Sequence, residues 1–359
     1  MNKSSELVKI RKILVRGVSI PSQFFLAPIN TGFSKDGLPD SRLVEFHHAR
    51  SGHRIGISYV GNVAISDRYR VSNATADIDR GEGMWKEVAA IISKNGSIAG
   101  IQLACQLDNE PATRKWRNRD QSRYVDRQQR FINSLSSLQL SQIVDGFVSA
   151  SQHATQLGFE VVQIHAAHGY LLSRLLSPTL NVRRDEFGKD RTLVLSQIIR
   201  RIRAASPKTL VDVRISMTTG LHRFEDDWDV TKHVIRTIVE SGADIVSISN
   251  GMYEVDRFQI YPPQPMGHAC YQQHAKMIAD EFPSTIVNIA GNIFSLSSLD
   301  DAPNNLTYSI GRALIADPEF VAKSSFGQAA EIRECRRTGH CHYFSRGKPH
   351  IECGVNHAL

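Results

Sequence analysis

The sequence predicts a (β/α)8 TIM barrel, and two observations support the prediction. Short runs rich in apolar and β-branched residues recur eight times, which is typical of buried strands. Segments with the apolar spacing of helices separate them, most clearly at 140–158 and 193–206, and glycines stop such segments before the next strand. The eight runs lie at 23–29, 54–65, 98–105, 159–166, 210–216, 243–249, 285–291 and 306–315.

Strands that are apolar almost throughout and alternate with helices indicate a parallel sheet covered on both faces, most economically a closed barrel. An open doubly wound sheet is the alternative, but no G-x-G-x-x-G follows the first run, where a dinucleotide-binding sheet would have it. We expect one domain over 1–359, with an N-terminal strand lid, the barrel at about 10–325 and a short C-terminal tail at 326–359.

The composition suits a cytoplasmic protein with reduced thiols. Five cysteines are an odd number spread thinly over 359 residues, unlike the dense sets of disulfide-rich domains. The first twenty residues contain no apolar stretch of signal-peptide length, and no later run reaches about 18 apolar residues, so we expect no membrane partner.

The net charge of +7 suits an anionic partner, and the densest basic run spans 114–130. Because this run also holds two aspartates and matches no recognisable binding motif, we expect no nucleic-acid partner. A solvated loop and a site for a phosphorylated ligand both remain open for it. A homo-oligomer is compatible with the sequence.

Polar residues at the ends of the predicted strands are the candidate site, because chemistry in such barrels lies at the carboxyl ends of the strands. Gly291, Gly311 and Arg312 follow the seventh and eighth strands, the usual phosphate-binding position. Glycine lets backbone N–H groups approach phosphate oxygens, and arginine adds a bidentate cation. A plain turn is the alternative for this pair of loops.

Two polar side chains stand within otherwise apolar strands. Burial of an isolated charge is costly, so the Arg214 guanidinium should meet an anion or a ligand that becomes anionic, unless it forms a structural ion pair across the barrel. Gln102 is an amide that either reads the edge of a heterocycle or is satisfied within the core.

The fourth strand ends in three proton-carrying residues, His165, His168 and Tyr170. Neutral imidazoles could bind a carbonyl or phenolate oxygen through their N–H groups, and Tyr170 could deliver a proton nearby. A zinc site would need a third ligand and lacks the helical H-E-x-x-H pattern, so we expect no metal. Satisfied packing residues are the alternative for each side chain alone.

The chain resembles the old yellow enzyme family of FMN-dependent ene-reductases, especially its branch near bacterial NADH:flavin oxidoreductases and 2,4-dienoyl-CoA reductases. Residues 160–188 look like the most specific stretch of the family, and 311–320 like its phosphate signature. The segments 24–30, 100–103 and 211–216 follow in the same order, and the similarity extends from about residue 10 to 356.

The resemblance implies a barrel that binds FMN non-covalently over its C-terminal mouth. Gln102 would bond the pyrimidine edge, and Arg214 would face the N1/O2 region, where reduced flavin becomes negative. The implied cofactor-binding residues are Pro28, Ile29, Asn30, Asn62, Gln102, Arg214, Gly291, Asn292, Gly311 and Arg312, the last four around the phosphate.

The resemblance also implies two half-reactions. NADPH or NADH first gives hydride to flavin N5, and a small-molecule substrate with an activated alkene then takes that hydride at its β-carbon. His165 and His168 would bond the activating oxygen, and Tyr170 would protonate the α-carbon from the opposite face.

The chain departs from the family at several positions. Asn30 stands where relatives usually have Cys or Thr, and the residues after Gln102 differ, so the contacts of that loop are in doubt. Of the four cysteines that hold a 4Fe–4S centre in some relatives, Cys341 and Cys353 match the last two, while Cys335 is one position out of register. We expect no cluster, with a shifted three-cysteine or zinc site as the alternative.

The same site could instead catalyse a redox-neutral isomerisation or oxidise a C–C bond in a biosynthetic pathway, because flavin chemistry is reversible. A protein that binds FMN without turnover is a further alternative.

Overall fold

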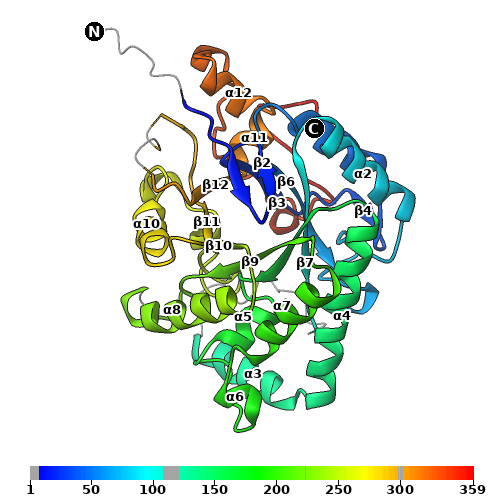
Figure 1. The fold of residues 1–359 in the computed structure, drawn as a ribbon, viewed down its shortest axis with the longest axis vertical. Helices are drawn as coiled ribbons and strands as arrows, with labels where there is room; N and C mark the ends of the chain where they lie inside the picture. Colours follow the sequence, from blue (N-terminus) through cyan, green and yellow to red (C-terminus); the bar gives the residue numbers. More distant parts are fainter. Residues whose placement is uncertain (1–7, 108–120, 223, 298, 300–301) are drawn as a thin grey trace.

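Eight parallel strands close into a barrel in this computed structural model, which describes residues 8–107, 121–222, 224–297, 299 and 302–359 (Figure 1). The last strand pairs with the first, with Tyr308 opposite Phe24 and Ile310 opposite Leu26. The predicted barrel is therefore confirmed. Its strands are β3 (Phe24–Ile29), β6 (Ile57–Ala64), β7 (Ile98–Ala104), β8 (Val161–Ala166), β9 (Leu210–Ser216), β10 (Ile245–Ser249), β11 (Ile286–Ala290) and β12 (Leu306–Ile310).

The helices lie around the strands and cover their outer faces (Figure 1). Ser136 begins α4 in a capping box with Gln139, and Asp40 caps α1, so side chains satisfy the first free N–H groups of both helices. The longer helices are α1 (Ser41–Arg50), α2 (Glu82–Lys94), α3 (Gln121–Ser134), α4 (Ser137–Gln156), α7 (Leu193–Ala205), α8 (Phe224–Glu240) and α10 (Gln272–Glu281). Short helices are α5 (Leu171–Leu176), α6 (Glu186–Lys189), α9 (Arg257–Ile260), α11 (Arg312–Ala316) and α12 (Phe320–Ser325).

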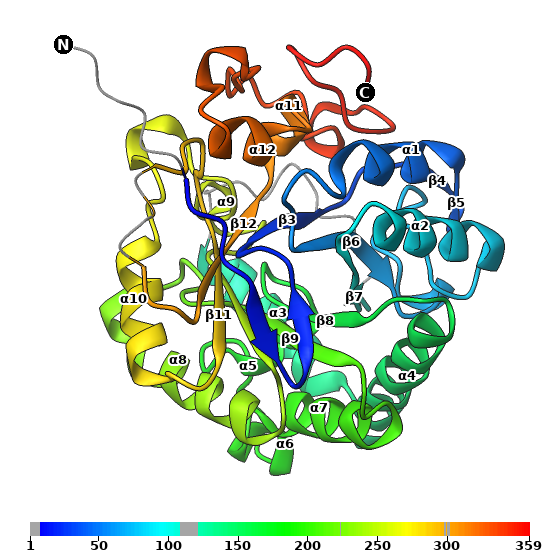
Figure 2. The same ribbon diagram turned by 45° about the horizontal axis from the view of Figure 1, so that its top comes forward.

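A β-hairpin closes the amino end of the barrel. It consists of β1 (Ile13–Val15) and β2 (Val18–Ile20), and Figure 2 shows it in blue across the ring of strands. Its apolar side chains pack against the first residues of several barrel strands, which gives the chain the N-terminal strand lid that we expected. This amino-end cluster comprises Ile13, Val15, Ile20, Phe25, Ile57, Tyr59, Val161, Leu210 and Ile245.

The carboxyl end of the barrel is covered differently, by loops and by the C-terminal tail. After β3 the chain forms a small hairpin, β4 (Ser34–Lys35) and β5 (Leu38–Pro39). The tail returns to the same region, where the backbone N–H of Ile351 donates to the carbonyl oxygen of Thr31 at 2.9 Å. The tail therefore lies against the loop that leaves the first barrel strand.

Two strand boundaries differ from the prediction by three residues or more. The eighth run was expected to continue to 315, but β12 ends at Ile310, and Gly311 is the N-cap of α11. The second run was expected from residue 54, but the strand starts at Ile57. Apolar helix residues that pack on the barrel produce the same local pattern as a buried strand, which explains the first difference.

The basic run at 114–130 is only partly within the described chain, since 108–120 lie outside it and the remainder belongs to α3. Among the described residues, no helix is both long and apolar enough to cross a lipid bilayer.

Candidate active site

A cavity of about 390 Å³ lies at the carboxyl ends of the barrel strands. Ligand sites of 300–1,000 Å³ are typical for molecules the size of cofactors and drugs. The cavity brings together every residue that the sequence analysis assigned to the site: Pro28, Ile29, Asn30, Asn62, Gln102, His165, His168, Tyr170, Arg214, Gly291, Asn292, Gly311 and Arg312.

The two histidines at the end of β8 have different surroundings. Their ring centroids are 5.0 Å apart, with the rings nearly perpendicular. His168 Nε2 lies 2.7 Å from the Ser249 hydroxyl, whereas His165 Nδ1 is buried and has no hydrogen-bond partner among the described residues. A buried ring nitrogen without a partner in a ligand-sized cavity is a position where a bound molecule can supply the missing bond.

Both imidazoles are neutral at physiological pH. Burial lowers the pKa of His165 and of His168 well below the usual value, and the Arg214 cation lowers both further. Burial raises the pKa of Tyr170 well above its usual value, and the nearby Tyr253, Tyr343 and Glu254 contribute to this. The site therefore presents uncharged N–H and O–H donors beside a fixed cation.

The Tyr170 ring lies against His165, with centroids 4.4 Å apart. Its oxygen accepts a hydrogen bond of 2.6 Å from Asn62 Nδ2. Asn62 Oδ1 in turn accepts a bond of 2.9 Å from Asn30 Nδ2. Because the Tyr170 oxygen is the acceptor of that bond, its own proton is left to be donated elsewhere.

Arg214 points from β9 into the barrel, where burial lowers its pKa and the Asp212 carboxylate opposes that shift. One guanidinium N–H donates to the Ser249 hydroxyl at 3.3 Å. Arg214 Nε is buried without a hydrogen-bond partner in the described part of the chain. The Nε–H group of Arg214 thus has hydrogen-bonding capacity that no described residue uses.

Below Arg214 lies a layer of polar side chains that the sequence analysis missed. Asp212 is fully buried, and its Oδ2 accepts bonds from Tyr59 at 2.6 Å, Gln163 at 2.5 Å and Ser247 at 2.8 Å. Burial raises the pKa of Asp212 to about 6, although these bonds oppose the shift. Asp212 precedes Arg214 by two positions, and Gln163 precedes His165 by two. Because side chains two positions apart in a strand lie on the same face, this spacing was the available signal that both point into the barrel.

This layer fixes the orientation of Gln102. The Gln163 Nε2 group donates to Asp212, so Gln163 Oε1 is turned toward Gln102 and accepts its N–H at 2.6 Å. Because the Gln102 nitrogen donates toward the barrel interior, its amide oxygen is the group that is left to face the cavity. Gln102 therefore offers an acceptor there.

The opposite side of the cavity is built by the loops after β11 and β12. Arg312 donates to Asn292 Oδ1 at 2.6 Å and to the Pro262 carbonyl oxygen at 2.9 Å. A Cβ placed on Gly311 would meet only the Cβ of Ala27, at 3.9 Å, so the space above this backbone is open to a ligand. Gly291 has a φ of 147°, which side chains rarely adopt.

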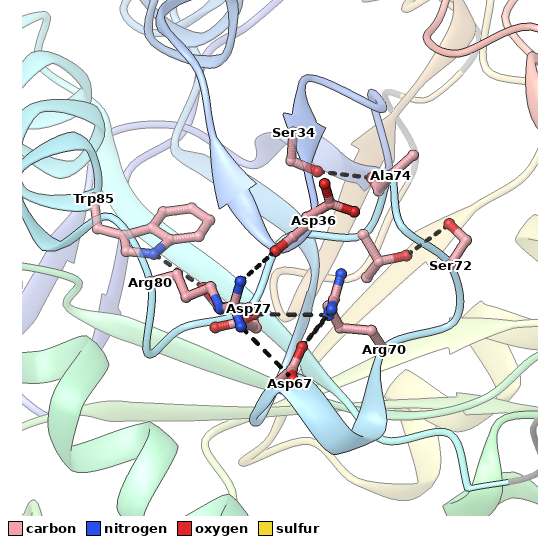
Figure 3. Close-up of polar contacts among 10 residues, drawn as sticks. Ser34, Asp36, Asp67, Arg70, Ser72, Ala74, Asp77, Arg80 and Trp85 are labelled. Atoms are coloured by element: carbon pink, nitrogen blue, oxygen red, sulfur yellow. Dashed lines mark hydrogen bonds and ion pairs between the residues drawn. The ribbon is translucent and has the colours of Figure 1, made fainter.

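The loop after β6 also lines the cavity, and polar contacts hold it in place (Figure 3). Asp77 is fully buried between two arginines. Its Oδ2 atom lies 3.5 Å from Arg80 Nε and 3.8 Å from Arg70 Nε. Arg70 also pairs with Asp67, and Arg80 donates to the backbone oxygen of Asp36 at 2.8 Å. These contacts position three lining residues that the sequence analysis did not include: Val71, Ser72 and Thr75.

The C-terminal tail supplies further lining residues that were missed. The His342 ring stacks on Tyr261, from the loop after β10, with centroids 3.8 Å apart. The tail has no regular strand or helix period, so no sequence pattern indicated that it would reach the site. Its lining residues are Cys341, His342, Tyr343, Phe344 and Ser345.

The tail cysteines are thiols without a disulfide. Burial and the neighbouring Cys335 raise the pKa of Cys341 to about 11. Within the ranges that the structure describes, no group of three or more His, Cys, Asp or Glu side chains is arranged to hold a metal ion.

Comparison with known proteins identifies the family. The model of the NADH:flavin oxidoreductase / NADH oxidase family matches residues 19–331. The chain belongs to this family. It is 24% identical to an NADPH dehydrogenase of Bacillus subtilis over 342 residues, which cover 89% of this chain and 95% of that protein. It is 27% identical over 282 residues to a NADH:flavin oxidoreductase of Gibberella zeae, covering 67% of this chain and 66% of that protein.

Solved structures share the fold of this family member. The Old Yellow Enzyme of Pichia sp. AKU4542 superposes with a TM-score of 0.67 at 17% identity, covering 90% of this chain and 88% of that one. A 2-naphthoyl-CoA reductase in complex with 2-naphthoyl-CoA superposes with a TM-score of 0.82 at 16% identity and covers 97% of this chain. The chain spans 56% of the length of that reductase.

The protein is accordingly an FMN-dependent NAD(P)H oxidoreductase, and its barrel has the fold of an Old Yellow Enzyme. The residues present fit FMN on three observations. Arg214 Nε is buried without a partner in the described chain, Gln102 offers an amide oxygen, and the backbone at Gly311 is open. The Arg214 guanidinium suits the edge of the flavin that becomes anionic, and the Gln102 oxygen suits its N–H edge. The open backbone at Gly311 suits the phosphate.

Proposed function

We propose that this oxidoreductase is an ene-reductase, which uses NADPH or NADH to reduce the C=C bond of an electron-poor alkene such as an enone or enoate. The observation that supports the proposal best is the pairing of two neutral imidazoles with one tyrosine hydroxyl in a single cavity. FMN, when bound, supplies the hydride that the alkene receives at its β-carbon.

Arg214, Gln102 and Asn30 would hold the isoalloxazine ring, and the loops around Gly311 and Arg312 would hold the phosphate. This division follows the chemistry of the side chains, since a buried guanidinium suits the edge that becomes negative on reduction. Pro28, Ile29, Asn62, Gly291 and Asn292 complete the set of cofactor-binding residues.

His165 and His168 would bind the activating oxygen of the alkene. A neutral imidazole donates an N–H to this oxygen, and the donation strengthens as negative charge develops there during the reaction. His165 Nδ1 has no partner in the described chain, whereas His168 already contacts Ser249 through its Nε2 atom. The Arg214 cation beside both rings favours the same developing charge.

Tyr170 would protonate the α-carbon. Its Oη–H bond breaks as a C–H bond forms, and the electron pair stays on the phenolate oxygen, which continues to accept the Asn62 N–H. Solvent water then returns a proton to the phenolate. General acids placed in this way typically contribute about 10²- to 10⁴-fold to the rate.

An anaerobic two-step titration tests the proposal. NADPH or NADH should bleach the flavin absorbance of the purified protein, and 2-cyclohexenone should restore it while cyclohexanone forms. The Tyr170→Phe variant should be bleached at the normal rate and reoxidised by the enone about 10²-fold more slowly or worse.

A matched control is Tyr308→Phe, which removes a hydroxyl from a buried tyrosine that packs on Phe24 and is not among the cavity-lining residues. It should reoxidise as the parent does. Reduction by nicotinamide without any reaction with activated alkenes would contradict the ene-reductase function, and a normal oxidative rate in Tyr170→Phe would remove Tyr170 as the acid.

A further inference from the structure

Tyr343 lies in the C-terminal tail, beyond the residues 19–331 that the family model covers. Its side chain is only 5% exposed, and it is one of the residues that line the cavity. Its hydroxyl donates a hydrogen bond of 2.8 Å to Asn30 Oδ1. A residue from outside the matched segment therefore touches a side chain in the centre of the candidate site.

Three hydrogen bonds join Tyr343 to Tyr170, and all have the same direction. Tyr343 donates to Asn30, Asn30 donates to Asn62, and Asn62 donates to Tyr170, at 2.8, 2.9 and 2.6 Å. An amide side chain that accepts at its oxygen has its N–H groups free to donate, so each bond sets the orientation of the next. The last acceptor, Tyr170, is left with its own proton for the cavity.

The direction of this chain is anchored at Asn30. Two donors converge on its Oδ1 atom, the Tyr343 hydroxyl and the backbone N–H of Gly32 at 3.1 Å. If the Asn30 amide turned over, its NH₂ group would face the Gly32 N–H, and that backbone donor would be left without an acceptor. The reversed chain, in which Tyr170 would donate its proton to Asn62, is thereby disfavoured.

Close packing holds Tyr343 beside Asn30. A Cβ added to Gly32 would lie 2.5 Å from the Pro349 carbonyl oxygen and 2.9 Å from the Tyr343 ring. The neighbouring bond from Ile351 N–H to Thr31 and the contact between the Phe33 and His350 rings, 5.5 Å apart, attach the tail to the same loop. Tyr343 and Asn30 are thus positioned by one interface.

We propose that Tyr343 is a positioning residue that acts through Asn30 and Asn62 to keep the Tyr170 proton directed at the substrate. The proposal rests on the function of Tyr170 as proton donor given above. When Tyr170 gives up its proton, the Asn62 N–H remains on the phenolate oxygen, so the orientation that presents the proton also stabilises the anion that is left. The same bond opposes the burial that raises the pKa of Tyr170.

The test is a set of three variants of the FMN-loaded full chain: Tyr343→Phe, Tyr170→Phe and the double variant. Reduction by NADPH and oxidation by 2-cyclohexenone are followed separately by rapid mixing, in H₂O and in D₂O. FMN affinity is measured by the quenching of flavin fluorescence. Tyr343→Phe keeps the ring in the interface and removes only the donor.

In Tyr343→Phe we expect reoxidation by the enone to slow about three- to tenfold, the range that the loss of one hydrogen bond supports. The solvent isotope effect on that step should increase because proton delivery becomes more limiting. Reduction by NADPH and FMN affinity should remain as in the parent. Tyr308→Phe is again the control, since it removes a buried hydroxyl elsewhere in the barrel.

The double variant separates positioning from a general structural role. If Tyr343 acts through Tyr170, removing the Tyr343 hydroxyl should have no further effect on the oxidative step in the Tyr170→Phe background. Equal effects in both backgrounds, or no effect in the parent, would overturn the proposal. A normal oxidative rate in Tyr170→Phe alone would instead refute the proposed function, so the two failures are distinguishable.

Tyr343→Met gives a second way to remove the hydroxyl if Tyr343→Phe does not fold. It should slow the oxidative step in the parent and have no further effect on it in the Tyr170→Phe background. A Tyr343→Met effect that is independent of Tyr170 would contradict the proposed chain of hydrogen bonds.

Discussion

The two ends of the barrel differ in chemistry although the same strands form both. At the amino end, the β1–β2 hairpin packs apolar residues such as Ile20 against the starts of the strands. At the carboxyl end, the same strands present histidines, amides and arginines to a cavity. Apolar burial stabilises one end, whereas the other keeps buried polar atoms without partners, such as His165 Nδ1 in the described chain.

This contrast indicates that stability and reactivity are carried by separate regions. Side chains at the amino end satisfy one another, so their replacement should cost folding free energy. Side chains at the carboxyl end are satisfied only in part by the protein, so their replacement should mainly cost binding and rate. Replacing one side chain at each end of the barrel tests this division.

Ile20→Ala should have the largest effect. Ile20 is fully buried in the amino-end cluster, and truncation of such a side chain costs about 2–5 kcal/mol. Unfolding of the FMN-loaded protein by denaturant measures the loss. The rates of flavin reduction and enone reduction below the transition should be unchanged, and slower chemistry with unchanged stability would contradict the division.

His165→Ala should show the opposite behaviour. Loss of one donor to a developing negative charge typically costs about 10²-fold in rate, or about 2.7 kcal/mol. Enone reduction should slow by that factor and phenol binding should weaken, as single-turnover kinetics and titration of the flavin absorbance can measure. The free energy of unfolding should fall by less than in Ile20→Ala, because the described chain supplies no hydrogen-bond partner for His165 Nδ1 to lose. Unchanged kinetics would refute the role of His165.

A smaller effect concerns the pH dependence of stability. Burial lowers the pKa of His165 in the folded protein. Below about pH 6.5 the unfolded chain therefore takes up a proton at this residue, whereas the folded chain does not. The free energy of unfolding consequently decreases as the pH falls. From pH 7.5 to 5.5 the free energy of unfolding should fall more in the parent than in His165→Ala. Ile20→Ala should retain the parent's slope, and equal slopes in all three proteins would contradict this linkage.

Much of the barrel could be predicted because its strands are apolar along their whole length. Val161–Ala166 and Ile57–Ala64 are buried at every position, which produces a local signal that needs no knowledge of the partner strand. The strand ends then identified the polar residues that face the cavity. The eighth run was predicted too long because the apolar residues of Arg312–Ala316 are buried in a helix.

The partners of the site residues could not be predicted in the same way. Tyr343 is more than 300 positions from Asn30 in the chain, and only the folded tail brings them together. The Asp212 layer depends on which strands are neighbours, since Gln163 bridges Asp212 on one side and Gln102 on the other. Side-chain type identifies such residues as candidates, but the direction of each hydrogen bond depends on tertiary packing.

The docked tail has an evolutionary consequence. The barrel strands are constrained from inside and outside, so a substitution in them disturbs packing on two sides. The tail meets the site through an irregular segment around Tyr343, and it also packs on the loop after β3, on Tyr261 and on α11. Descendants of this protein could therefore retune the environment of Tyr170 by changing a few tail residues, while the barrel that positions the flavin is inherited intact.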